Sequence, residues 1–122
     1  MNEWEQEPDH KEFKYKGYDC EIKRIPNLGH LCGYVIINHN NELFGHDDSG
    51  NSMCMNLDVH GGITYGQSEL DGRWKIGFDC AHVDDVCPYN FFGNPQGATY
   101  KNIEFVTSEI KKLVDQVAEY EE

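Results

Sequence analysis

Apolar positions along the chain change their period near residue 102, from strand-like patterns to a helical one. Aromatic and β-branched residues alternate loosely over residues 13–25, which predicts a strand with a break at Gly17. The largely apolar run 31–38 predicts a central strand covered on both faces. Residues 53–66 and 73–82 predict two further strands, with a turn between them.

From Asn102 onward the apolar residues are spaced by three and four positions, which predicts one long helix. Its apolar seam consists of Ile103, Val106, Ile110, Leu113, Val117 and Tyr120. Asn102 can cap this helix, and Glu104 suits its positive N-terminus. Two interpretations of the seam remain open. It can pack on the sheet, or it can contact a second helix in a dimer.

Several strands followed by one helix predict the α+β class, with a mainly antiparallel sheet of about four to five strands and one long C-terminal helix. The 122 residues are enough for one domain, which we expect at residues 13–122. Residues 1–12 are polar and are expected to form a flexible N-terminal segment.

The charge balance excludes some partners. Ten Lys and Arg against 22 Asp and Glu give a net charge of −12, which disfavours DNA, RNA and anionic membranes. A small anionic ligand needs only a few well-placed donors and remains possible. No apolar run approaches membrane-spanning length and no signal-peptide pattern is present, so we expect a cytoplasmic protein with free thiols and no cofactor.

Two chemical hypotheses concern the histidines of the central region. Cys80, His82 and Cys87 form a C-x-H-x4-C pattern that zinc would accept, although the paired cysteine knuckles of structural zinc sites are missing. With zinc bound there, the chain would be a small zinc-containing interaction protein. Ordinary packing of these side chains is the alternative. His60 or His82, beside Asp58, Asp79, Asp84 or Asp85, could instead supply the base of a phosphodiesterase or of a hydrolase acting on NAD derivatives.

Aromatic residues supply a third hypothesis, a nucleotide-binding surface. Trp74, Phe78, Phe91 and Phe92 lie within nineteen residues, and the last two are adjacent in a segment rich in Gly, Asn and Pro. At least one of the two adjacent rings should lie at a surface or interface, where nucleobases can stack. The alternative is that these rings cover one end of the core.

Three motifs together resemble the first family of Thoeris anti-defence proteins. They are "HGGITYG", "WKIGFDCAHVDD" and the helix opening "YKNIEFVTSEIKKL", and the resemblance spans about residues 20–117. Members of this family are phage proteins that sequester an immune signal in the cytoplasm of the host bacterium. The signal is a cyclic ADP-ribose isomer made by a TIR-domain enzyme, and it is bound without being cleaved.

The resemblance also implies an assembly and a set of site residues. It implies a homodimer that can assemble further into a hexamer, with the signal bound at the dimer interface, and in some members cyclic oligonucleotides at a second site. For this chain it implies a signal pocket formed by Trp74, Phe78, Phe91, Phe92 and Asn94, with cations of the terminal helix at the phosphates. The candidates for phosphate contact are Thr107, Lys111, Lys112, Arg73 and a partner subunit, and Arg24 is the candidate for a second anion site. Relatives tend to carry Arg at the positions of Thr107 and Lys111, so this chain has lost one charge and one bidentate donor there.

Overall fold

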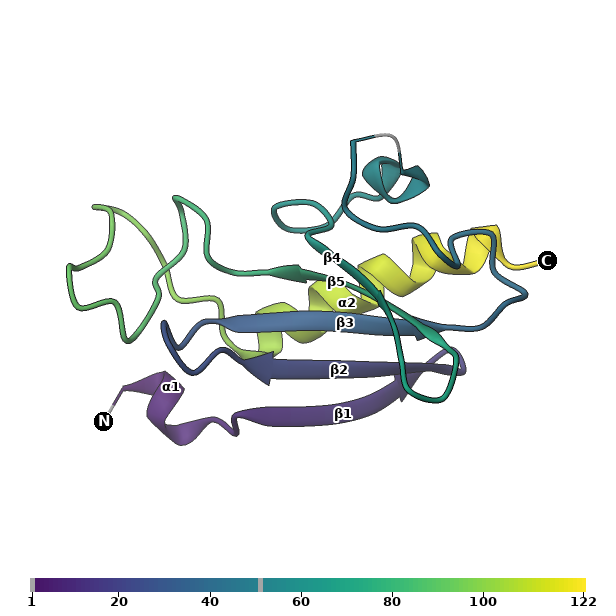
Figure 1. The fold of residues 1–122 in the computed structure, drawn as a ribbon. Helices are drawn as coiled ribbons and strands as arrows, with labels where there is room; N and C mark the ends of the chain where they lie inside the picture. The colour runs from purple at the N-terminus through teal and green to yellow at the C-terminus, as the bar shows by residue number, and fades with distance from the viewer. Residues whose placement is uncertain (1, 51) are drawn as a thin grey trace.

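A five-stranded antiparallel sheet with the order β1-β2-β3-β5-β4 forms the frame of the protein. The computed structural model describes residues 2–50 and 52–122. The strands are β1 (His10–Tyr15), β2 (Tyr18–Arg24), β3 (Leu31–Ile37), β4 (Tyr65–Ser68) and β5 (Trp74–Asp79). The helix α2 (Ile103–Val117), continued by the 3-10 turn η2 (Ala118–Tyr120), crosses one face of this sheet (Figure 1). The predicted α+β class is thereby confirmed.

The helix packs on the sheet through its apolar seam. Val106, Ile110, Leu113 and Val117 are each 0% exposed within a single chain. β3 accepts the helix closely because it carries Gly33, where a Cβ atom would lie 2.9 Å from the Ile110 side chain of α2. Of the two interpretations of the seam, packing on the sheet is therefore the one observed.

The first residues of the chain are part of the frame, and the expected boundary at residue 13 is too late. A short helix, α1 (Glu3–Gln6), precedes β1, which already begins at His10. The Glu7 carboxylate accepts a hydrogen bond from the backbone N–H of Ile103 at 2.8 Å and so helps Asn102 cap α2. This capping contact ties the N-terminal segment to the start of the long helix.

The segment 13–25 forms a hairpin, not one broken strand. β1 and β2 pair over their whole length, from His10 opposite Lys23 to Tyr15 opposite Tyr18. The chain reverses at Lys16 and Gly17, which both have positive φ angles. Gly17 was the expected break, but alternation alone did not indicate that the chain turns back on itself.

The prediction of a strand over residues 53–66 is mostly wrong. Residues 53–56 form the 3-10 turn η1 (Met53–Asn56), and only Tyr65 and Gly66 of the predicted range belong to β4. The segment between them lies along α2. There the side-chain amide of Gln116 accepts a hydrogen bond from the Asp58 backbone N–H and donates one to the Asp58 backbone C=O, each at 2.7 Å. These backbone groups are satisfied by helix side chains, so they need no neighbouring strand.

No helix within the described residues is long and apolar enough to cross a membrane.

Candidate functional site

A cavity of about 500 Å³ lies between the N-terminal half of α2 and the segment formed by α1 and β1. Thr107 and Lys111, two residues that the resemblance implied, line it from the helix. Lys11 lines it from β1, a residue that the sequence analysis did not single out. The volume is within the range of small-molecule sites, about 300–1,000 Å³.

The polar groups of this cavity are incompletely paired. The Nζ atom of Lys111 lies 5.4 Å from the centre of the Tyr15 ring, and that of Lys11 lies 5.9 Å from the centre of the Phe13 ring. Neither lysine forms an ion pair within residues 2–50 and 52–122. The Oγ1 atom of Thr107 is buried and has no hydrogen-bond partner there. Two cations are thus available to an anion, and the buried hydroxyl of Thr107 lies unpaired beside the cavity.

The cavity is also lined by carboxylates, and one of them is firmly held. Glu7 accepts hydrogen bonds from the Tyr100 hydroxyl at 2.5 Å and from Ile103 N–H at 2.8 Å. Burial, together with the hydrogen bond to Glu7, raises the pKa of Tyr100. Glu3 and Glu104 also line the cavity, so any ligand bound here meets both signs of charge.

Phe91 and Phe92 present their rings to solvent. The two residues are 94% and 96% exposed, and the rings meet edge to face with their centres 5.9 Å apart. The loop 80–100 that carries them projects beyond the end of the sheet where α1 lies and α2 begins (Figure 1). Asn94 fixes the base of this loop, because its amide accepts from Cys87 N–H at 2.8 Å and donates to Cys87 C=O at 3.2 Å.

Trp74 and Phe78 lie elsewhere. Trp74 starts β5 at the end opposite the loop 80–100, where its indole N–H donates to the His46 carbonyl at 2.8 Å. Phe78 is 1% exposed in the core, so the expectation that its ring stacks on a ligand is not met. One chain therefore does not assemble the aromatic pocket that the resemblance implied.

The two predicted arginines are paired within the chain. Arg73 binds Asp19 at 2.6 Å and Asp71 at 2.8 Å, and these two hydrogen bonds raise its pKa. The Arg24 side chain is only 2% exposed and donates to the Gly29 carbonyl and to Asp9, both at 2.8 Å. The expected second anion site at Arg24 is therefore wrong, because its guanidinium already holds the turn and the N-terminal segment together.

The two motifs "HGGITYG" and "DCAHVDD" meet at a polar corner built around Asp85. The Asp85 side chain is fully buried, and both its oxygens lie 2.9 Å from His60 Nε2. It also accepts from the His82 backbone N–H at 3.0 Å and pairs with Lys101 at 2.9 Å. Burial acts to raise the pKa of Asp85, but the hydrogen bonds from His60, His82 N–H and Lys101 outweigh it and lower the pKa.

This corner has the His–Asp dyad of a hydrolase, but its cysteine is unsuited to act as a nucleophile. Cys80 is 1% exposed, and burial raises the pKa of its thiol, which disfavours the reactive thiolate. The His82 ring packs over Gly61, where a Cβ atom would lie 2.1 Å from Nε2. His82 Nε2 lies 2.9 Å from Asp79 but makes no hydrogen bond. The corner accounts for His60, Gly61, His82 and Asp85 as one packed unit.

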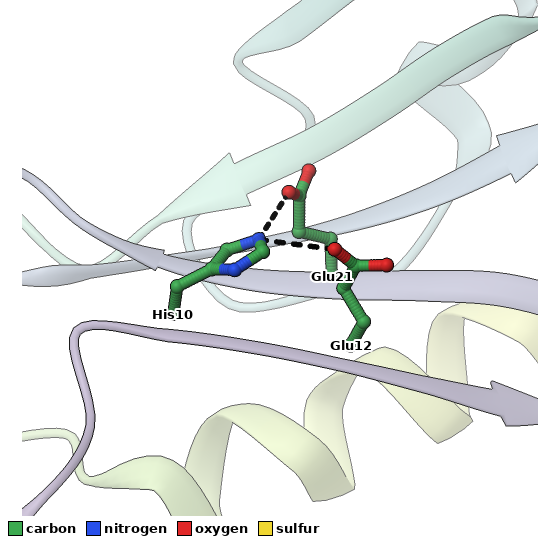
Figure 2. A group of neighbouring side chains, drawn as sticks. All are labelled: His10, Glu12 and Glu21. Carbon is green, nitrogen blue, oxygen red and sulfur yellow. Dashed lines mark hydrogen bonds and ion pairs between the residues drawn. The ribbon is translucent and has the colours of Figure 1, made fainter.

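The predicted zinc ligands do not come together, whereas three other residues do. Cys87 faces His30, with Sγ 3.9 Å from Nδ1, and does not converge with Cys80 and His82. Within the described residues, the one group of three metal-binding side chains with ligand atoms inside 4.8 Å is His10, Glu12 and Glu21 (Figure 2). The pairing of β1 with β2 creates this group, so residue spacing alone did not reveal it.

Comparison with known proteins adds no relative. No protein-family model, no curated protein and no solved structure matches this chain.

Proposed function

We propose that this protein sequesters a cyclic ADP-ribose isomer, the signal of a Thoeris-type defence, without cleaving it. The observation that carries the proposal is the cavity on α2, where Lys11 and Lys111 lack carboxylate partners within the described residues and Thr107 Oγ1 lacks a hydrogen bond. Groups left unpaired in a chain of net charge −12 are suited to a pyrophosphate.

The remaining parts of such a ligand find matching chemistry nearby. The exposed rings of Phe91 and Phe92 offer a stacking surface for adenine. The carboxylates of Glu3 and Glu104 can accept hydrogen bonds from ribose hydroxyls. The phenylalanine rings do not line the cavity of their own chain, so the proposal includes a homodimer in which each loop reaches the cavity of the other copy.

A hydrolase is the second candidate, and the His60–Asp85 contact favours it. An imidazole held 2.9 Å from both oxygens of a buried carboxylate is the arrangement of an oriented general base. Its substrate would be the same class of molecule, since phosphoanhydride and N-glycosidic bonds are both present in a cyclic ADP-ribose isomer. The two candidates differ in what happens to the ligand after binding.

The fate of the ligand decides between them. The protein is incubated with the cyclic ADP-ribose signal of a Thoeris system and passed through a size filter, and the retained protein is then heat-denatured. Depletion of the filtrate with intact signal released on heating is the expected result. Release of an opened or hydrolysed product would favour the hydrolase, and signal left wholly in the filtrate would contradict both proposals.

A matched pair of lysine variants tests the cavity itself. Lys111→Gln removes the unpaired cation and should weaken retention of the signal by about tenfold or more, since a hydrogen bond to a charged group contributes about 1.5–3 kcal/mol. Lys112→Gln is the control, because Lys112 lies next in sequence but is engaged by Glu109 at 3.4 Å. Equal weakening in both variants would show that general charge, not this cavity, holds the ligand.

A further inference from the structure

His10, Glu12 and Glu21 converge on the sheet face opposite α2, away from the cavity of the proposed function. His10 Nε2 lies 2.5 Å from Glu21 Oε2 and 3.7 Å from Glu12 Oε1. Figure 2 shows the three side chains turned toward one another, with one ring nitrogen of His10 directed at both carboxylates. All three ligand atoms lie within 4.8 Å of one another.

The strand pairing fixes this convergence. His10 and Glu12 are two residues apart on β1 and so point to the same face, while Glu21 is the direct cross-strand partner of Glu12. Like charges placed directly opposite each other in a sheet are destabilising unless something lies between them. The backbone therefore holds two carboxylates and an imidazole at a spacing that favours a cation.

Lys75 orients one of the carboxylates from behind. Its side chain is 9% exposed, and its Nζ atom lies 2.6 Å from Glu21 Oε1 and 3.3 Å from Glu69. This contact occupies one oxygen of Glu21 and leaves Oε2 directed at His10. Metal-binding carboxylates are commonly held by such an outer partner.

Other charges on this face leave room for a dication. Lys75 contacts the carboxylates of Glu21 and Glu69, and the charge of Lys23 also acts on Glu21. These two lysines leave one of the three negative charges of Glu12, Glu21 and Glu69 unbalanced. Lys14, further along β1, is paired with Asp19 at 3.1 Å. Lys23, the cross-strand partner of His10, has an exposed side chain.

We propose that His10, Glu12 and Glu21 form a site for a divalent zinc ion. Imidazole nitrogen and carboxylate oxygen bind zinc at about 2.0–2.2 Å, which puts neighbouring ligand atoms about 3.4 Å apart in a tetrahedron. The observed separations of 2.5 and 3.7 Å lie on either side of that value. Water completes the fourth position, which faces solvent because Glu12 and His10 are 72% and 46% exposed.

Zinc at this site would join the edge strand β1 to β2. Among the described residues, β1 is the outermost strand of the sheet on this side. A metal bound by two residues of β1 and one of β2 stabilises that pairing, because the ion binds the folded arrangement and not the unfolded chain.

Calorimetric titration with zinc chloride, on protein free of any affinity tag, tests the proposal. We expect one ion per chain, with about tenfold or greater loss of affinity in His10→Ala and in Glu12→Gln. His39→Ala, which removes an exposed histidine outside the site, should bind as the wild type does. The five cysteines are all buried and should not compete in the folded protein.

Cobalt supplies a second measurement that does not depend on stability. Co²⁺ bound by an imidazole and carboxylates should give visible absorption that disappears in His10→Ala. No zinc binding at millimolar concentration would overturn the proposal. So would equal affinity in the wild type and His10→Ala, because the ion would then be bound elsewhere on an acidic surface.

Discussion

The Asp85 corner and the Phe91–Phe92 loop lie within eight residues of each other in sequence, yet they are built in opposite ways. In the corner, a fully buried carboxylate meets His60, Lys101 and the His82 backbone N–H. In the loop, two large apolar rings are almost completely exposed. The corner pairs every charge it buries, whereas the loop leaves apolar surface in water.

This difference separates structural from functional residues better than residue type does. His and Asp are typical of catalytic sites, but here hydrogen bonds and packing within the fold account for their positions. Exposed adjacent phenylalanines contribute nothing comparable to the core, so a partner or ligand is the simpler reason for them. We therefore propose that the corner stabilises the fold and that the loop binds the ligand or partner.

The largest expected effect is the loss of the corner in Asp85→Ala. Three donors would lose their buried acceptor, so we expect the free energy of unfolding to fall by about 3–5 kcal/mol in urea denaturation. Asp84→Ala, which alters an exposed neighbour, should change it by less than about 0.5 kcal/mol. A small loss of unfolding free energy in Asp85→Ala would contradict a stabilising role for the corner.

In the loop, the double variant Phe91→Ala with Phe92→Ala should leave stability unchanged and weaken ligand binding. Since the rings bury little surface, the midpoint of unfolding should stay within about 1 °C. Retention of the cyclic signal should fall by about tenfold or more, because stacking contributes about 1–3 kcal/mol per base. Leu70→Ala is the control, since Leu70 is fully exposed in another part of the molecule. Unchanged retention would remove the loop from the binding surface.

A smaller effect is expected from acid, which should weaken the stabilising contribution of the Asp85 corner. The pKa of Asp85 is lower in the folded protein than its ordinary value, because the hydrogen bonds from its partners outweigh the opposing effect of burial. Its contribution to stability is therefore present above about pH 4, its unfolded range, and is lost as the pH falls through the lower folded value. The difference in unfolding free energy between wild type and Asp85→Asn should shrink from pH 5 to pH 3. A constant difference would contradict this assignment.

The sequence predicted those elements whose apolar pattern directly reflects burial. The seam from Ile103 to Val117 and the apolar run of β3 both face the core, so period and composition located them. The prediction of a strand failed over residues 53–64 because the backbone there forms hydrogen bonds with Gln116 and Glu109 on α2. Local propensity does not encode such contacts. The hairpin of β1 and β2 was missed because the two strands share one continuous alternating pattern.

The candidate site was predictable only where the chain itself brings residues together. Thr107 and Lys111 are one helical turn apart, so their shared cavity follows from α2 alone. Arg24 and Phe78 carry suitable chemistry, but tertiary contacts enclose both side chains. His10 and Glu21 are eleven residues apart and meet only through strand register, which sequence spacing did not reveal.

The smallest expected effect lies at the junction between the two regions, where Asn94 holds the base of the loop to Cys87. Asn94→Ala removes one accepted and one donated backbone hydrogen bond, which should cost about 1–2 kcal/mol of local stability. Burial raises the pKa of the Cys87 thiol, so a thiol reagent should label it slowly in the wild type and several-fold faster in the variant. Cys80, inside the corner, should stay protected in both proteins. Faster labelling of both cysteines would mean that the corner and the loop open together, and the separation of stability from binding would then fail.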